Sequence, residues 1–244
     1  MKRKIFFILC LLLPFCFGFG FGYTKSEPQP RIFEILDKYN QIILNIKDAT
    51  ADLTLDSNLF LFGCSGIMRQ QGKLYFKAPD KLRADTTDHN TYFVRNNNIR
   101  KIDGEGNKFY IYLLYSLDYS VGFNANLISA NFYLSLLKDS PDEIIMRGIP
   151  KPEVLKNAKE VLIYFDPKTN LLNKFEVLFT DKRFNGTIYI YYQKIDELWV
   201  PSGFQGKTAV ELPNSIMVGM GLNFTIKNIK INTGLSDQFF NPGF

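Results

Sequence analysis

The clearest pattern in the chain is the alternation of apolar and polar residues over residues 72–85. Leu74 and Phe76 alternate with polar or amphipathic neighbours, which is the period of two of a strand with one buried face. Pro79 cannot donate a backbone hydrogen bond to a strand ladder, so it ends this strand. Alternation then resumes over residues 82–85. The segment therefore predicts a β-hairpin with a polar turn.

A different period, with steps of three and four, predicts an amphipathic helix between residues 31 and 48. Its apolar positions are Ile32, Ile35, Leu36, Tyr39, Ile42, Ile43 and Ile46. A second helical segment, or two short helices, is expected over residues 124–138. The residues that suggest it are Leu127, Ile128, Phe132, Leu134 and Leu137.

The other apolar segments are short and are separated by Gly, Asn, Asp and Pro, which indicates strands in series joined by turns. Residues 60–67 are too uniformly apolar to distinguish a strand end from a mobile loop. The series predicts a single antiparallel meander. The expected strands are 51–56, 92–94, 99–102, 109–114, 143–149, 160–165, 171–179, 187–192, 199–204, 207–212 and 222–231.

The N-terminal segment has the pattern of a secretory signal peptide. A basic start at residues 2–4 is followed by an apolar run over residues 5–17 and by glycines at 18, 20 and 22. The apolar run is shorter than the roughly 20 residues that span a bilayer. We therefore expect cleavage after residue 22, a linker over 23–30, and one domain over 31–244. The alternatives are an uncleaved membrane anchor and lipidation of Cys16, although bulky Phe15 precedes that cysteine.

Charge and cysteine content argue against nucleic-acid binding and against a disulfide-stabilised fold. The full chain carries a formal charge of +5, and loss of Lys2, Arg3 and Lys4 with the leader leaves +2. This near balance gives no electrostatic case for nucleic-acid binding. Of three cysteines only Cys64 would remain, which excludes an internal disulfide and favours a small buried apolar side chain.

The sequence contains no pattern of catalytic residues that indicates an enzyme. His89 is the one histidine and lies in a polar turn, without a nucleophile elbow or a phosphate-binding loop elsewhere. A metal site needs several converging His, Cys or carboxylate ligands, and the supply of histidine and cysteine is too small. Asp139, Asp142 and Glu143 cluster beside Pro141, where a solvated loop is expected. We predict no catalytic residue, no metal and no cofactor.

Four segments together give the chain a family resemblance. They are the hairpin "glycine, apolar strand, Pro-Asp-Lys-Leu-Arg", the turn at residues 166–172, a "strand ending in Pro" at Trp199-Val200-Pro201 after a dipeptide turn, and the tail at 226–240 with Asp237 and Phe239. In this order they resemble the LolA-like lipoprotein and lipid carriers. The resemblance implies an α+β, mostly β fold: a strongly curved antiparallel sheet, or half-barrel, with an N-terminal helix and short inserted helices covering the concave face.

The resemblance also implies a function. LolA-like proteins are periplasmic carriers that move lipoproteins or lipids toward the outer membrane, receiving them from an inner-membrane release complex and passing them to an outer-membrane acceptor. Exposing an acyl chain to water costs about 0.8 kcal/mol per CH₂, so a soluble carrier must bury the chain against an apolar surface. We expect a monomer. Candidate lipid-binding residues on alternating strands are Leu74, Phe76, Leu82, Phe175, Val177, Phe179, Ile188, Ile190 and Tyr192, although an ordinary core shows the same alternation.

One departure and two alternatives accompany this expectation. In typical carriers an arginine often precedes the hairpin proline, where it helps to hold a lid shut, whereas this chain has Ala78. Arg83 lies beyond the turn and cannot be assumed to replace that arginine. The family resemblance therefore implies the fold more strongly than it implies the gating mechanism. The alternatives are an envelope stress sensor or regulator on the same scaffold, and an envelope interaction module that binds protein partners through exposed strand edges.

Overall fold

The computed structural model describes residues 30–61, 64–78, 81–87, 91–95, 98–101, 125–152, 158–181, 184–212 and 216–241. The predicted leader, most of the linker, Pro79, His89 and the strand expected at 109–114 lie outside these residues. No helix among the described residues has the length and apolar character needed to cross a membrane.

Two α-helices and a 3₁₀-helix accompany the strands of the described chain: α2 (Pro30–Leu44), α4 (Ala125–Asn131) and η1 (Asp237–Phe240). The strands of the first half are β1 (Asp48–Leu61), β2 (Cys64–Lys77), β3 (Lys81–Thr86), β4 (Thr91–Arg95) and β5 (Asn98–Lys101). Those of the second half are β6 (Phe132–Asp139), β7 (Ile144–Pro150), β8 (Ala158–Phe165), β9 (Leu172–Phe179), β10 (Phe184–Ile195), β11 (Leu198–Leu212) and β12 (Ile216–Ile231).

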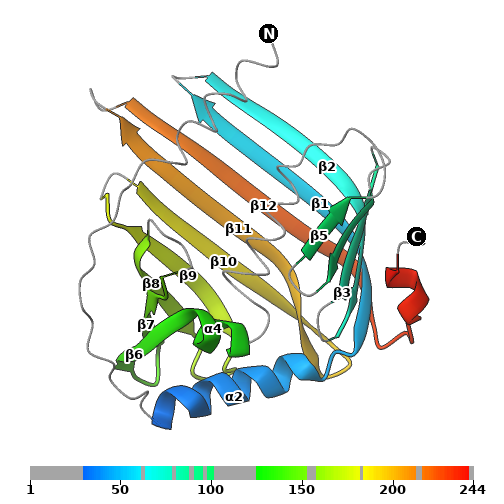
Figure 1. Ribbon diagram of the computed structural model, residues 1–244, viewed down its shortest axis with the longest axis horizontal. Coiled ribbons are helices and arrows are strands. Elements are labelled where there is room, and N and C mark those ends of the chain that lie inside the picture. The colour runs from blue at the N-terminus through cyan, green and yellow to red at the C-terminus, as the bar shows by residue number, and fades with distance from the viewer. Residues whose placement is uncertain are drawn as a thin grey trace.

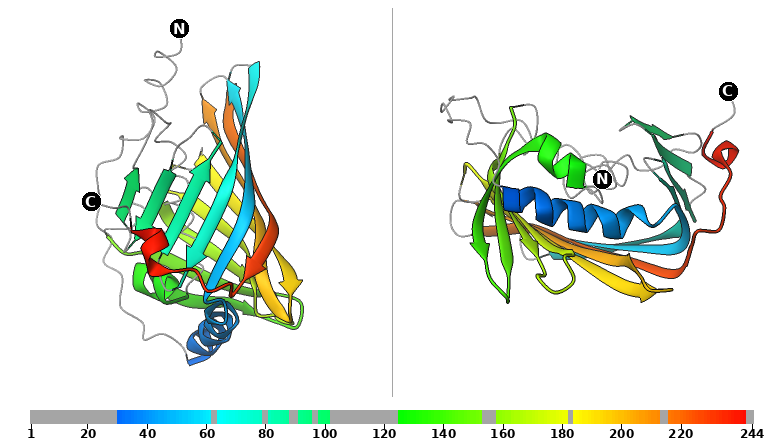
Figure 2. Two further views of the ribbon diagram at one scale, coloured as in Figure 1. Left: turned by 90° about the vertical axis from the view of Figure 1, so that its right-hand side faces the viewer. Right: turned by 90° about the horizontal axis from the view of Figure 1, so that it is seen from below.

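The described strands form one twelve-stranded sheet in the order β5-β4-β3-β2-β1-β12-β11-β10-β9-β8-β7-β6, and neighbouring strands in it are antiparallel. The first strand therefore pairs with the last, from Ala49 opposite Ile231 to Phe60 opposite Gly219. The sheet curves around α2, with β5 at one edge and β6 at the other (Figures 1 and 2). Two meanders are thus joined side by side through β1 and β12.

Helix α2 lies inside the curve and buries one stripe of its surface (Figure 2). Its buried residues are Ile32, Ile35, Leu36, Tyr39 and Ile43, as the spacing of three and four predicts, while Phe33 on the other side is 46% exposed. They form one buried cluster with residues of β1 and β6–β12. The helix ends at Leu44, and the predicted apolar position Ile46 is buried just beyond it.

The C-terminal tail is attached to the other face of the sheet. Asp48 accepts hydrogen bonds from the backbone N–H of Thr233 (2.6 Å) and of Gly234 (3.0 Å). The ring of Phe239 then packs edge-on against Tyr75 of β2, with ring centroids 4.7 Å apart. Arg83 of β3 stacks on the same phenylalanine, its Cζ lying 4.3 Å from the ring centroid. The tail motif therefore lies against β2 and β3.

The structure corrects the helical prediction at residues 124–138. The helix ends at Asn131 and β6 begins at Phe132. Phe132, Leu134 and Leu136 alternate onto the core side, whereas Leu137 occupies a bulge in the ladder with β7 and is 56% exposed. The bulge shifts the apolar spacing from two to three, which imitates the period of a helix.

Three further predictions about the strands are corrected. The strands expected at 199–204 and 207–212 are one continuous strand, β11, because its ladder with β10 runs through Gly206. Pro201 does not end a strand: it lies within β11 at a register shift opposite Tyr191 and Tyr192, where a ladder tolerates proline. The prediction of a single meander is also wrong, because β1 pairs with β12, which is not its neighbour in sequence.

Candidate functional site: the inner face of the curved sheet

We call the face of the sheet on which α2 lies the inner face. Neighbouring strands present apolar side chains to it in register, for example Leu55 opposite Phe224, Phe224 opposite Phe204, and Phe204 opposite Ile190. All four side chains are at most 5% exposed. They share one buried cluster with the apolar stripe of α2. This part of the inner face is therefore ordinary core.

Burial decreases along the same face away from α2. On β12, Phe224 is buried, whereas Leu222 and Met220 are only partly buried. On β9, Phe175 is fully buried, whereas Val177 and Phe179 are partly exposed. The apolar alternation thus continues beyond the part of the face that α2 covers. We call this region the open half; it comprises Val177, Phe179, Gly186, Ile188, Gly206, Met220 and Leu222.

Two tyrosines mark the boundary between the covered part and β10. The hydroxyl oxygens of Tyr39 and Tyr192 lie 3.5 Å apart, and the Tyr192 hydroxyl donates to the carbonyl oxygen of Leu172 at 2.9 Å. Burial raises the pKa of Tyr39 to about 12 and raises that of Tyr192 well above its usual value. Both hydroxyls therefore stay neutral at physiological pH and act as hydrogen-bonding groups that fix α2 over the core.

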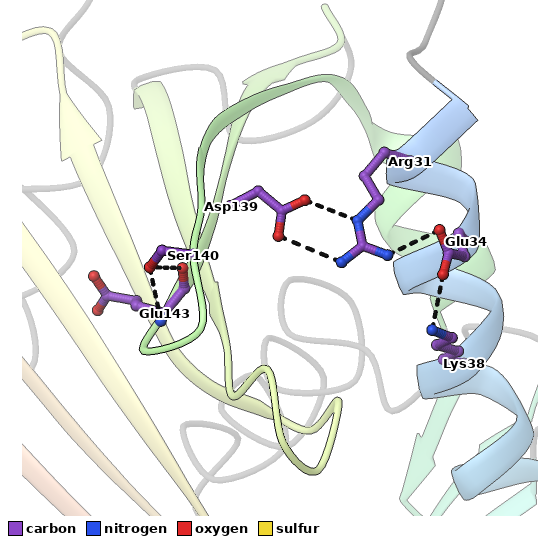
Figure 3. A network of polar contacts seen from close by, with 6 residues as sticks. All are labelled: Arg31, Glu34, Lys38, Asp139, Ser140 and Glu143. Atoms are coloured by element: carbon purple, nitrogen blue, oxygen red, sulfur yellow. Dashed lines mark hydrogen bonds and ion pairs between the residues drawn. The ribbon is translucent and has the colours of Figure 1, made fainter.

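A polar network also fixes the N-terminal end of α2 (Figure 3). The Arg31 guanidinium contacts Asp139 through two hydrogen bonds of 2.8 and 3.3 Å and pairs with Glu34 at 2.8 Å. Glu34 also pairs with Lys38, and the two cations lower the pKa of Glu34 to about 2. These pairs are largely exposed, so water screens them and each contributes little to stability. Of the three, the Arg31–Asp139 pair connects the helix to the β6–β7 hairpin.

Helix α4 is tied to α2 by one side chain. The Asn40 carbonyl oxygen accepts from the backbone N–H of Ala125 at 2.9 Å, and its amide nitrogen donates to Asn126 Oδ1 at 3.2 Å. Asn40 is 9% exposed, and Ala125 and Ile128 of α4 are buried. The pair of helices lies together inside the curve of the sheet (Figure 2). This arrangement agrees with the inserted helix that the family resemblance implies.

The structure separates the nine predicted lipid-binding residues into three groups. Phe175 and Ile190 belong to the buried core, and Tyr192 packs against it through its hydrogen bonds. Leu74, Val177 and Ile188 are partly buried at the edge of that core. Phe76, Leu82 and Phe179 are partly buried outside it. Phe76 and Leu82 pair across β2 and β3 on the same face as Leu74.

Sequence reasoning missed Leu222 and Met220 as part of this face. Their signal is visible in the sequence, because residues 220, 222, 224 and 226 of β12 are all apolar at a spacing of two. It also missed the glycines of the open half, Gly186 and Gly206. A glycine gives no apolar signal, so only the register places it on this face.

The outer face of the sheet has different chemistry. Tyr189 and Tyr191 of β10 are 38% and 48% exposed, and Leu178 of β9 is 36% exposed. The Arg147–Glu160 ion pair joins β7 and β8 there, and the Lys174–Glu176 pair lies along β9. Arg83 also belongs to this face, because it stacks on the tail. Arg83 therefore does not replace the arginine that precedes the hairpin proline in typical carriers, where this chain has Ala78.

Acidic side chains of the described residues form ion pairs and no metal-binding group. No group of three or more His, Cys, Asp or Glu side chains that could hold a metal ion occurs among them. Of the acidic cluster at the β6–β7 turn, Asp139 pairs with Arg31 and Glu143 with Lys138. The cluster is thus a partly solvated loop with structural ion pairs, as its sequence context predicts.

The comparison with solved structures decides the fold. Over 88% of this chain and 98% of the other, the structure is similar to a DUF1329 family protein from Desulfovibrio piger, with a TM-score of 0.61 and 14% identity. It is also similar to a LolA superfamily protein from Nitrosomonas europaea, over 86% and 97% of the two chains, with a TM-score of 0.56 and 10% identity. The chain has a LolA-like fold.

A third similar structure agrees with this LolA-like fold. It is a putative outer membrane lipoprotein-sorting protein domain from Vibrio parahaemolyticus, with a TM-score of 0.54 and 12% identity over 86% of this chain and 95% of the other. No model of a known protein family matches the chain, and no curated protein matches it. The resemblance inferred from the hairpin, turn and tail motifs is therefore confirmed at the level of the fold.

Proposed function

We propose that this protein is an envelope carrier that binds the acyl chains of lipoproteins or lipids against the open half of its inner face. The observation that carries the proposal is the fall in burial along the apolar alternation. On β9 and β12 the same face passes from fully buried side chains to the partly exposed Val177 and Leu222. An acyl chain on this surface gains about 0.8 kcal/mol for each CH₂ removed from water.

The LolA-like fold supports the proposal, since the similar domain from Vibrio parahaemolyticus is described as a lipoprotein-sorting domain. A carrier needs no nucleophile, metal or redox group, only a surface that binds apolar chains and then releases them. The signal-peptide pattern at residues 1–22 favours a periplasmic location for such a carrier. Its partners would then be an inner-membrane donor and an outer-membrane acceptor, and its cargo acylated proteins or free lipids.

Native mass spectrometry of the protein purified from the periplasm, followed by organic extraction, tests this function. The proposal expects a stoichiometric lipid or acylated protein that leaves on extraction. A protein that is empty and also refuses acyl probes would contradict it and would favour an envelope interaction module. Cell fractionation tests the location independently, because the proposal requires a mature chain that has lost its leader and is released with the periplasm.

A further inference from the structure

Four strands extend together to the end of the sheet that lies away from α2 (Figures 1 and 2). The ladder of β1 with β2 continues to Leu61 opposite Cys64, and the ladder of β11 with β12 continues to Leu212 opposite Ile216. Because β1 also pairs with β12, these strand ends form one four-stranded extension of the sheet. We call it the apolar tip, and it comprises residues 59–61, 64–67, 209–212 and 216–219.

The apolar tip has apolar residues on both faces of the sheet. Strand parity places Leu59 and Val218 on the inner face. It places Phe60 and Ile67 on the outer face. Glu211 is the one charged residue among the residues of the tip. The tip therefore has no polar face to turn toward water, unlike a strand with one buried face.

Two adjacent residues of β2 show that both faces of the tip are open. Ile67 on the outer face is 73% exposed. Gly66 lies on the inner face, and a Cβ added there would meet no heavy atom of the described chain within 4 Å. Helices α2 and α4 lie at the other end of the sheet, so neither covers the tip (Figure 1). An exposed apolar surface of this kind marks a contact with a partner or a membrane.

Charged residues of the outer face mark where the apolar tip begins. Arg69 of β2 pairs with Asp56 of β1 at 2.6 Å, and the Arg69 side chain is 64% exposed. Lys207 of β11 is exposed as well. From the pair Asp56–Arg69 to the pair Leu61–Cys64 the ladder advances five residues, or about 17 Å. This length exceeds the roughly 5–10 Å that an interfacial segment enters a bilayer.

A bilayer accounts for these features better than a partner protein does. A partner chain packs on one face of a sheet or along its edge, whereas a bilayer surrounds an inserted hairpin end on both faces. The insertion must be shallow, however. In the part of the chain that the structure describes, the ladder of β2 with β3 ends at Gly72, so β2 is an edge strand at the tip. Unpaired backbone groups are excluded from the hydrocarbon core, which limits this edge to the hydrated interface.

We propose that the apolar tip inserts end-on into the interface of a lipid bilayer, with Arg69 and Lys207 at the level of the headgroups. Long basic side chains are favourable at this level, because their apolar stems lie against the acyl region while their charges stay hydrated. Membrane contact of this kind does not depend on the proposed acyl binding. Met220 and Leu222 of the open half directly follow the tip along β12, so the tip would bring the open half next to a membrane.

Vesicle flotation tests the proposal. Protein purified from the periplasm, with loss of the leader checked by its mass, is mixed with phosphatidylcholine vesicles at low and at high salt. Ile67→Asp and Gly66→Asp place a charge on opposite faces of the tip, at positions that have room for it. Leu137→Asp is the matched control, because Leu137 is also an exposed apolar residue but β6 lies at the α2 end of the sheet (Figure 1). Thermal unfolding of each variant confirms that it folds.

The wild type and Leu137→Asp should float with the vesicles at both salt concentrations, because salt does not screen apolar insertion. Ile67→Asp and Gly66→Asp should each bind about tenfold more weakly, because a carboxylate at this depth must be desolvated. Val177→Glu, which changes the open half, should float like the wild type.

Three results would overturn the proposal. A wild type that does not float would show that the tip has no affinity for a bilayer. A loss confined to Ile67→Asp would indicate a one-faced contact, with a partner protein or with a second copy of the chain. A loss in Val177→Glu as large as that in the tip variants would mean that the open half, and not the tip, holds the vesicles.

Discussion

Tyr39 of α2 and Tyr192 of β10 meet with their hydroxyl oxygens 3.5 Å apart, where the helix packs on the inner face of the sheet. Tyr192 uses its own proton for the Leu172 carbonyl oxygen at 2.9 Å, so Tyr39 donates to Tyr192. The ring of Tyr39 also packs edge-on against Phe165, with centroids 5.7 Å apart. These three contacts together join α2, β8, β9 and β10.

This direction of donation predicts unequal effects of two conservative substitutions. Tyr192→Phe leaves the Leu172 carbonyl and the buried Tyr39 hydroxyl without their partner, so it should lower the free energy of unfolding by about 1–3 kcal/mol. Tyr39→Phe removes only the longer contact and should cost less than about 1 kcal/mol. Urea unfolding of both variants measures the difference. Equal losses would contradict the assigned donor.

The glycines predict opposite responses to the same change. Gly72→Ala forces a Cβ against Asp85 O and should destabilise the protein by about 1–3 kcal/mol, as overpacking does. Gly186→Ala and Gly206→Ala meet only ordinary contacts, so they should be neutral or should stabilise by up to about 1 kcal/mol. Thermal unfolding of the three variants tests the pattern. A loss at Gly186 as large as that at Gly72 would show that the inner face tolerates no added atom.

The tail contains a carboxylate with a low pKa. Asp237 lies 2.8 Å from Lys77 Nζ and 2.9 Å from Lys81 Nζ, and their hydrogen bonds lower its pKa to about 2. Because the folded-state pKa is depressed, the ionised pair contributes fully above the ordinary value of 3.8 and is lost as pH falls through about 2.

An NMR titration of the side-chain carboxyl carbon checks this value. The wild type should titrate near pH 2, and the double variant Lys77→Met, Lys81→Met should titrate near the ordinary value of 3.8. Lys174→Met, in a strand far from the tail, serves as the control and should leave the midpoint unchanged. A midpoint near 3.8 already in the wild type would mean that the tail does not hold this contact in solution.

Asn40 predicts how firmly α4 is held over the inner face. Asn40→Ala removes the acceptor for the Ala125 N–H and the donor for Asn126, and leaves the first turn of α4 without this anchor. A lost buried hydrogen bond costs about 1–3 kcal/mol. Amide hydrogen exchange in α4 should accelerate accordingly, while exchange in β1 and β12 stays slow. Unchanged exchange in α4 would show that other contacts hold the helix.

The sequence predicts the elements better than it predicts their neighbours. The α2 stripe and the hairpin at β2–β3 have strong periods, and both elements form where those periods predict them. The pairing of β1 with β12 joins residues far apart in the chain, such as Ala49 and Ile231, and no local period encodes such a contact. At β6 the bulge at Leu137 changes the period itself, so the local pattern favours the wrong element.

The candidate site shows the same limit. Alternation correctly gathers Phe175, Val177 and Ile188 on one face, because a strand's parity fixes the face of each side chain. Parity does not tell which members lie beneath α2. Phe175 is fully buried and Val177 is partly exposed, although they are close neighbours on the same strand face. That distinction depends on where the helix crosses the sheet, which is a tertiary property.

Acyl binding on the inner face is tested most directly by comparing two adjacent residues of β9. Val177 lies on the inner face and Leu178 on the outer face, so Val177→Glu and Leu178→Glu place the same charge on opposite sides of one strand. Titration with a long-chain fluorescent fatty acid should show binding by the wild type and by Leu178→Glu. Val177→Glu should bind at least about tenfold more weakly, because a charge beside an acyl chain must be desolvated. Equal affinity of the two folded variants would contradict acyl binding on the inner face.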